Sequence, residues 1–194
     1  MKRIFLTLMT ALSLSSLLLQ GCVFVAGAAA GAVAIAAVYD HRSIQNVLND
    51  TELANKIVRK INMSAALRDE SHIEVIVFNH VVLLTGETPK AAWRDEAGEI
   101  AKSMPNVERV YNQLTIQGPT SSLTRTSDSW ITTKIKSEML AEKDLKSGSI
   151  KVVTENGVVY LMGMVSREQA DIAVDIARQV QGVQKVVKVF QYKN

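Results

Sequence analysis

Residues 150–161 have the sequence IKVVTENGVVYL, in which two β-branched runs flank Asn156-Gly157. An Asn-Gly pair is a strong signal for a type I′ turn, which joins two antiparallel strands into a hairpin. Residues 73–84, IEVIVFNHVVLL, follow the same pattern around Asn79-His80. Asn tolerates the positive φ angles that such a turn needs, although His is less suited to them than Gly. Both stretches therefore predict a β-hairpin.

The two hairpins belong to two copies of one longer unit. Asp50–Gln117 aligns with Asp128–Lys193, with shared apolar positions and a Leu-x-Gly at the end of each hairpin. Self-similarity of this kind indicates a tandem repeat. We therefore predict five segments: an export signal at 1–21, a tether at 22–49, a first domain at 50–117, a polar linker at 118–127 and a second domain at 128–194.

A helix is predicted on each side of each hairpin. Before it, apolar residues recur every four positions, as at Ile131, Ile135 and Met139, and so predict an amphipathic helix. After it, Thr88 with Pro89 is expected to begin a helix in the first copy, and Ser166 with Gln169 forms a capping box in the second. Residues that favour left-handed caps, Asn106 and Gly182, are expected near the ends of these helices.

The last strands are expected at 107–116 and 183–192, which gives each copy the order αββαβ. Two helices packed on one face of a three-stranded mixed sheet make the predicted fold class α+β. Each copy is close to the lower size limit for an independent hydrophobic core. We therefore expect the two domains to contact each other.

The first residues resemble a bacterial lipoprotein signal. Lys2 and Arg3 precede a long apolar run that ends in Leu19-Gln20-Gly21-Cys22, which is similar to the lipobox. That resemblance implies a covalent diacylglycerol and an N-acyl chain, palmitate among the possible chains, on Cys22. An ordinary signal peptide or an uncleaved transmembrane helix is the alternative. Val23 after the cysteine, in place of the Asp that retains lipoproteins in the inner membrane, implies transport to the outer membrane.

The apolar run at 23–38, VFVAGAAAGAVAIAAV, is rich in Ala and Gly. It is shorter than the roughly 20 residues that a transmembrane helix needs. We interpret it as a tether close to the bilayer surface.

Composition argues against several classes of chemistry. The chain has 194 residues, a formal net charge of +3, one Cys and three His, namely His41, His72 and His80. A single Cys rules out an intramolecular disulfide and disfavours a Cys/His zinc site. No catalytic motif is present, and we interpret the acidic set Asp95, Glu96 and Glu99 as a solvated helix face. We expect no enzyme activity, no cofactor, no metal and, for want of a dense basic stripe, no nucleic-acid partner.

The hairpin ending in Leu-x-Gly, the helix that follows it and the strand beginning Gly182-Val183-Gln184-Lys185-Val186 resemble the BON domain. The first copy departs from this pattern, with Asn106 in place of the glycine. Together with the lipobox, the two copies resemble the dual-BON outer-membrane lipoproteins. The resemblance implies a lipid-anchored protein on the periplasmic face whose second domain binds anionic phospholipid, gathers at division sites and supports envelope integrity.

Comparison of the copies indicates a binding surface. Trp130 aligns with Glu52, and at 100° per residue it points about 140° away from the apolar face of its helix. A face with exposed apolar bulk and lysine suits an anionic bilayer interface. The predicted phospholipid-binding residues are Trp130, Thr133, Lys134, Lys136, Ser137 and Leu140. In the alternatives, Trp130 covers the start of the helix, packs against the first domain or the linker, or binds an envelope protein as an interface hot spot.

Overall fold

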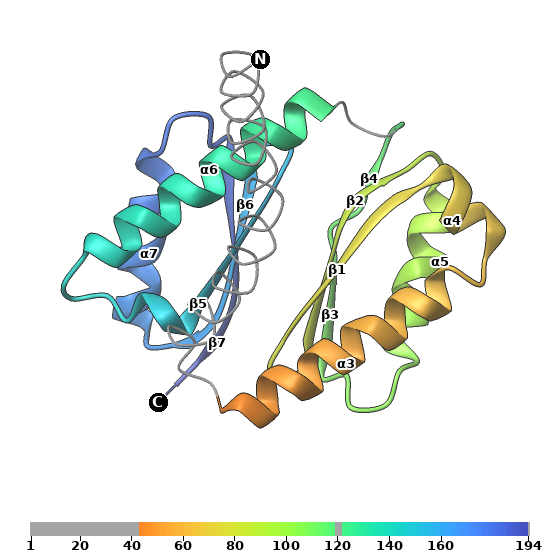
Figure 1. Cartoon of the computed structure of the whole chain (residues 1–194), viewed down its shortest axis with the longest axis horizontal. Helices are drawn as coiled ribbons and strands as arrows, with labels where there is room; N and C mark the ends of the chain where they lie inside the picture. The colour runs from red at the N-terminus through yellow and green to blue at the C-terminus, as the bar shows by residue number, and fades with distance from the viewer. Residues whose placement is uncertain (1–42, 119–121, 194) are drawn as a thin grey trace, which may run out of the picture. The chain divides into compact units, whose positions relative to one another are not determined.

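The computed structural model of the protein describes residues 43–118 and 122–193. Two domains of one design follow each other along the chain (Figure 1). The first contains α3 (Ile44–Ile61), α4 (Ala65–Glu70), β1 (His72–Phe78), β2 (Val81–Thr88), α5 (Ala91–Lys102), β3 (Arg109–Asn112) and β4 (Thr115–Ile116). The second contains α6 (Ser122–Ala141), a 3-10 turn at Ser147–Ser149, β5 (Ile150–Glu155), β6 (Val158–Val165), α7 (Arg167–Gln179) and β7 (Lys185–Tyr192).

Both predicted hairpins are present. β1 pairs antiparallel with β2, and β5 pairs antiparallel with β6. The turn residues have positive φ in both copies: 48° at Asn79 and 64° at His80, then 51° at Asn156 and 73° at Gly157. The backbone of a type I′ turn is therefore kept at His80, although a non-glycine residue is disfavoured there.

Each sheet is mixed, because its last strand runs parallel to the central strand. β7 pairs along the whole length of β6, from Val158–Lys185 to Val165–Tyr192. In the first domain β3 and β4 pair with β2 in two short pieces. The interruption falls at Gln113-Leu114, where Leu114 is buried in the core of the domain. The α+β prediction is confirmed, and the single strand predicted at 107–116 is divided.

The second helices begin differently in the two domains. Ser166 caps α7 and accepts a hydrogen bond from the Gln169 backbone N–H at 3.2 Å, as predicted. The predicted capping box is incomplete, because the Gln169 side chain bonds to the backbone of Asp144 and Lys146 instead of Ser166. The prediction that Thr88 caps α5 is wrong, because Thr88 is the last residue of β2 and the N-cap is Lys90, which makes no side-chain capping bond. Parallel pairing of Thr88 with Ile116 extends the strand into the position where the sequence indicated a cap.

The first helix of the second domain starts early. α6 begins at Ser122, so residues 122–127 of the stretch predicted as a linker are helical. Polar residues without apolar periodicity give no sequence signal for a solvent-exposed helical turn.

Across the described ranges, no helix has the length and apolar character needed to cross a membrane.

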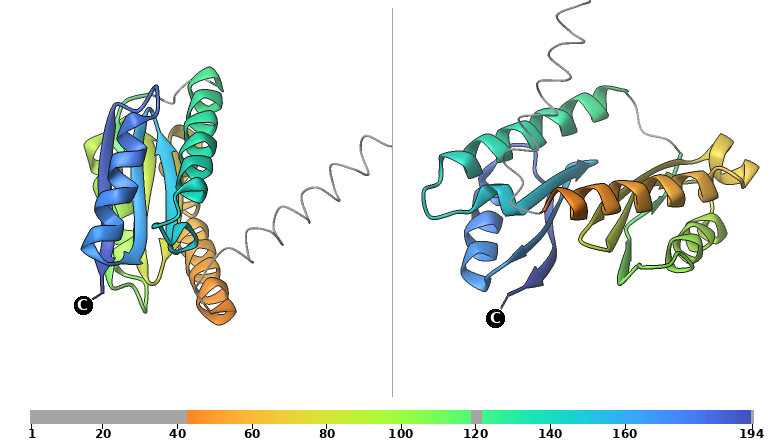
Figure 2. Two further views of the ribbon diagram at one scale, coloured as in Figure 1. Left: turned by 90° about the vertical axis from the view of Figure 1, so that its left-hand side faces the viewer. Right: turned by 60° about the horizontal axis from the view of Figure 1, so that its bottom comes forward.

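Each domain has its own core, between its helices and one face of its sheet. Ile57 and Leu84 are central in the first domain, and Ile135 and Leu161 in the second. Figure 2 (left) shows α3 and α6 on one side of the molecule and α5 and α7 on the other. Because the equivalent helices share a side, the first helices of both copies face the same surroundings.

The opposite faces of the two sheets contribute to a third apolar cluster. It joins buried residues of both domains, which lie in one compact unit of the chain: Ile76, Phe78, Val81, Leu83, Val153, Tyr160, Met162 and Val189. Hydrogen bonds also connect the two domains at this junction between their sheets. The Asn79 side chain donates to Gln191 Oε1 at 2.9 Å, and the Asn156 side chain donates to Glu87 Oε1 at 2.7 Å. The turn asparagine of each domain thus bonds to the other domain.

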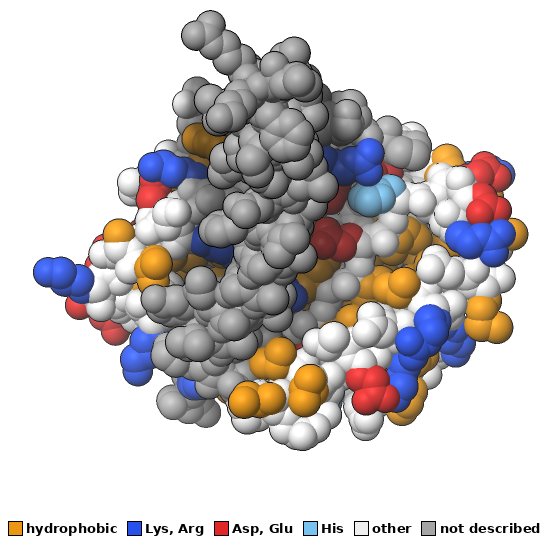
Figure 3. Space-filling model, viewed as in Figure 1, with side chains coloured by type: hydrophobic (Ala, Val, Ile, Leu, Met, Phe, Trp, Pro, Cys, Tyr) orange, Lys and Arg blue, Asp and Glu red, His pale blue; other side chains and the backbone are white. Residues whose placement is uncertain are grey.

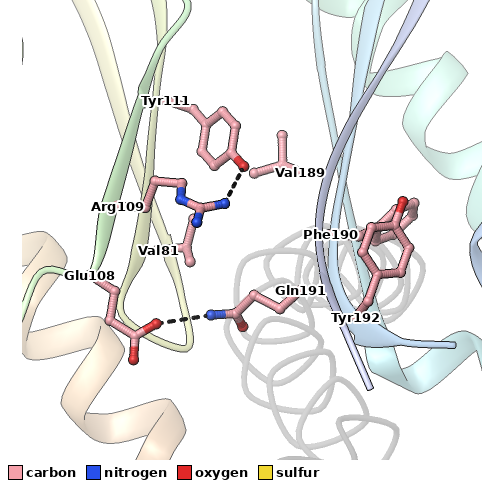
Figure 4. Close-up of a pocket in the computed structure, with 8 residues that line it drawn as sticks. All are labelled: Val81, Glu108, Arg109, Tyr111, Val189, Phe190, Gln191 and Tyr192. Carbon is pink, nitrogen blue, oxygen red and sulfur yellow. Dashed lines mark hydrogen bonds between the residues drawn. The ribbon is translucent and has the colours of Figure 1, made fainter. Parts of the chain in front are cut away.

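One end of the junction encloses a small cavity of about 370 Å³, shown in Figure 4. Gln191 of β7 reaches across it and donates to Glu108 Oε2 at 3.2 Å. Arg109 donates to the Tyr111 hydroxyl at 3.3 Å on the opposite wall. Side chains of both domains therefore line this cavity and bond across it.

Candidate functional site

The two faces of α6 differ in burial. Ile131, Ile135 and Met139 are buried against the second sheet, as predicted. Trp130 and Leu140 are the large apolar residues on the other side, with 53% and 59% of their surfaces exposed. A side chain that covered the helix start or packed into the first domain would be far less exposed than Trp130 is.

The other predicted residues, Thr133, Lys134, Lys136 and Ser137, are all exposed. Lys134 pairs with Glu138, with 3.2 Å between Nζ and Oε1. The hydroxyl of Thr133 donates to the carbonyl of Ser129, and that of Ser137 to the carbonyl of Thr133, each at 2.9 Å. Both hydroxyl protons are therefore used within the helix, and each oxygen retains capacity only as an acceptor. Among the described residues Lys136 has no ion-pair partner and presents a free ammonium group.

The rotation of α6 is fixed by Asp128, two residues before Trp130. Asp128 is buried, and its two carboxylate oxygens accept the backbone N–H groups of Asn156 and Gly157, each at 2.8 Å. Two residues correspond to 200° of helix, so anchoring Asp128 toward the hairpin turns Trp130 outward. Hydrogen bonds from N–H groups to a carboxylate are among the stronger ones in proteins.

The first helix of the first domain is anchored to its hairpin in the same way. Asp50 of α3 is buried and accepts the N–H groups of Asn79 at 2.6 Å and His80 at 3.0 Å. Sequence reasoning missed both aspartates as structural residues. The available signal was the recurrence of Asp at the same alignment position, with an Asn-led turn at nearly the same distance downstream in both copies.

The acidic set of α5 and the histidines of the first hairpin lie outside the predicted surface of α6. Asp95, Glu96 and Glu99 are exposed, and Asp95 and Glu99 pair with Arg94 at 2.9 Å and with Lys102 at 2.8 Å. His72 and His80 are partly buried, and the Nδ1 of His80 lies 2.9 Å from the carbonyl oxygen of Asn106. Within the described ranges no group of three His, Cys, Asp or Glu side chains has the geometry to hold a metal ion. Cys22, His41 and the tether at 23–38 lie outside the described residues.

Comparison with known families identifies both repeats. Residues 49–118 and 127–194 each match the model of the BON domain. The matched ranges agree with the repeat boundaries drawn from the sequence within one residue at each start. They also include Asp50 and Asp128, so the helix anchor belongs to the matched unit.

Three relatives match over most of the chain. The chain is 37% identical to the outer membrane lipoprotein DolP of Haemophilus influenzae over 178 residues, covering 92% of each protein. It is 37% identical to a 21 kDa hemolysin of Actinobacillus pleuropneumoniae over 153 residues, covering 79% of each. It is 31% identical to the osmotically inducible protein Y of Escherichia coli, covering 74% of this chain and 72% of that protein.

Proposed function

The chain belongs to the BON-domain family and is of the DolP type, and from this premise we propose that it is an outer-membrane lipoprotein anchored through acylated Cys22. Its two domains face the periplasm, and the second binds anionic phospholipid through the outer face of α6. The observation that supports this function is the exposure of Trp130 and Leu140 on a helix whose rotation is fixed by Asp128.

The outer face of α6 has the chemistry of a bilayer interface. Trp130 and Leu140 are ten residues apart, which places them about 15 Å apart along the helix axis. An indole ring partitions at the level of the lipid headgroups, and Leu140 adds apolar area on the same outer side. The exposed basic residues beside them are Lys134 and Lys136, and the half-buried Glu138, which pairs with Lys134, is the acidic residue nearby. Each basic residue near an anionic membrane contributes about 1 kcal/mol.

Because the lipid anchor holds the protein at the membrane, a weak affinity of the second domain for lipid is enough for binding. Acyl chains on Cys22 would confine the domains to the membrane, since burial of each methylene contributes about 0.8 kcal/mol. The second domain then meets lipid at a high effective concentration and needs little intrinsic affinity. Under this proposal the local content of anionic lipid determines where the protein gathers, which supplies a physical route to enrichment at division sites and to a role in envelope integrity.

The test is an NMR titration of residues 43–194 with phosphatidylglycerol micelles and, separately, with zwitterionic phosphatidylcholine micelles. The proposal predicts shifts selective for the anionic lipid, centred on 130–140 and weakened by salt. Trp130→Glu is the matched variant, because Glu is the residue at this position in the first copy. No shift in a folded domain would overturn lipid binding. Binding of an envelope protein at the same face without lipid would establish the adaptor function instead.

A further inference from the structure

Two buried carboxyl groups meet where the second hairpin reaches the first domain. Glu87, near the end of β2, is 0% exposed, and Glu155, at the end of β5, is 9% exposed. The side chain of Asn156, next to Glu155, donates to Glu87 Oε1 at 2.7 Å and connects the two domains at this point. A carboxylate is rarely buried so completely without a positively charged partner.

The hydrogen bonding of the pair is incomplete unless it holds a proton. Among the described residues, neither Glu87 Oε2 nor Glu155 Oε1 has a hydrogen-bond donor. One proton between the two carboxyl groups would supply the missing donor and would halve the buried negative charge. Burial and the charge of Glu87 raise the pKa of Glu155 to about 7, which favours the protonated form. Repulsion between two carboxylates that share a site raises the pKa of one of them in this way.

The groups that surround Glu155 come from several elements. Asp128 of α6 and Glu74 of β1 contribute further negative charge that raises the same pKa. Tyr160 of β6 is itself affected, because its burial and the charge of Glu155 raise its pKa to about 12. A cleft of about 570 Å³ borders Glu155 and is also lined by His72, Arg125 and Lys151. Figure 3 shows acidic and basic side chains beside a histidine in this hollow between α6 and β1.

We propose that Glu87 and Glu155 form a proton-binding site that fastens the second hairpin to the first sheet, so that the junction between the domains loosens when the proton leaves. The site requires no metal and no other ligand. The pair is buried at the junction, away from the exposed side chains of Trp130 and Leu140, although Thr133 of the phospholipid surface also lines the cleft beside Glu155.

The direction of the pH dependence follows from the raised pKa. Separation of the domains would remove the charges of Glu87 and Glu74 and part of the burial, so that the pKa of Glu155 would fall from about 7 toward its ordinary value of 4.5. Its contribution to the stability of the junction is therefore fully present below about pH 4.5 and is lost as the pH rises through about 7. A protein exposed to the medium outside the cytoplasm would hold its two domains together more firmly in mild acid.

The test follows the carboxyl carbons of Glu side chains by ¹³C NMR in the full-length chain, held in uncharged detergent micelles, from about pH 5 to pH 9. The expected result is a Glu155 midpoint near 7. Backbone amides of the junction in both domains, such as those of Leu83 and Val189, should change with the same midpoint. A Glu155 midpoint below 5, or chemical shifts of the junction amides that do not change with pH, would overturn the proposal.

Two variants separate the shared proton from a general effect of pH. Glu155→Gln supplies a permanent donor to Glu87 and should make the junction amides insensitive to pH over this range. Glu74→Gln, at an exposed acid of the same cleft, should keep the transition. If Glu155→Gln does not fold, Glu87→Gln serves in its place, because its amide can accept from Asn156 and donate to Glu155. A transition that persists in the folded Gln variant of the pair would contradict the shared proton.

Discussion

α3 and α6 occupy the same position in the two domains and differ where they meet solvent. Both have a buried Asp that accepts two N–H groups of the following hairpin turn. On the outside, Glu52 of α3 pairs with Lys56 at 2.6 Å, while the equivalent position of α6 is the exposed Trp130. Both copies of the repeat therefore keep the same inner face of this helix and the same rotation. The outer face is free to acquire a separate function.

The largest expected effect comes from removing the shared anchor. Asp128→Ala leaves the N–H groups of Asn156 and Gly157 without an acceptor, which should cost about 3 kcal/mol of unfolding free energy. Asp50→Ala should cost a similar amount, since the same two bonds are lost in the first domain. Urea denaturation measures both, with the exposed Asp175→Ala as a control of little effect. A loss below about 1 kcal/mol in both variants would show that the aspartates do not anchor the helices.

The next largest effect is expected from Trp130, the residue that distinguishes the outer face of α6 from that of α3. Trp130→Glu removes an interfacial aromatic side chain and adds a negative charge, so binding to vesicles rich in phosphatidylglycerol should weaken at least tenfold, or about 1.4 kcal/mol. Sedimentation with vesicles measures the change. Gln179→Glu adds the same negative charge at an exposed position of α7 and is the matched variant, which should leave the binding intact.

A smaller effect is expected from the free ammonium group of α6. Lys136→Val introduces the residue that α3 has at the equivalent position, Val58, and removes one basic group near the membrane. The loss of about 1 kcal/mol corresponds to roughly a fivefold weaker association with anionic vesicles. The dependence on salt should become less steep. Equal affinity and an unchanged dependence on salt would place Lys136 outside the interface.

The smallest effect is predicted for the apolar side chains that α3 exposes before Asp50. Ile44 and Leu48 are 79% and 57% exposed, and they precede the part of α3 that aligns with 128–141. Leu48→Asn should change vesicle binding less than twofold if α6 is the contacting helix. A loss as large as that of Trp130→Glu would show that α3 contacts the membrane as well as α6.

Local patterns predicted much of this architecture. Alternating β-branched runs around an Asn-led turn identified both hairpins, and the four-residue apolar period identified the inner faces of α3 and α6. The same angular argument predicted that Trp130 and Leu140 are exposed. These features depend on neighbours within one helix or hairpin, which is why a sequence reveals them.

The remaining features depend on contacts between distant segments. Nothing near Glu87 in the sequence indicates that it meets Glu155, 68 residues later, at the junction of the domains. Thr88 resembles a helix cap locally, but its pairing with Ile116 extends β2 through it. The anchoring role of Asp128 becomes visible only when its hairpin partners are placed beside it. Local propensity was overridden at each of these positions by tertiary structure.

The most direct measurement exchanges the outer faces of the two first helices. A chain with Trp130→Glu and Leu140→Asn, combined with Glu52→Trp and Asn62→Leu, is titrated with phosphatidylglycerol micelles and followed by NMR. Each substitution introduces the residue that the other copy has at the aligned position. The account predicts that lipid-dependent shifts disappear from α6 and arise on α3. Shifts that remain on α6 in the folded variant would contradict the claim that its outer face binds the membrane.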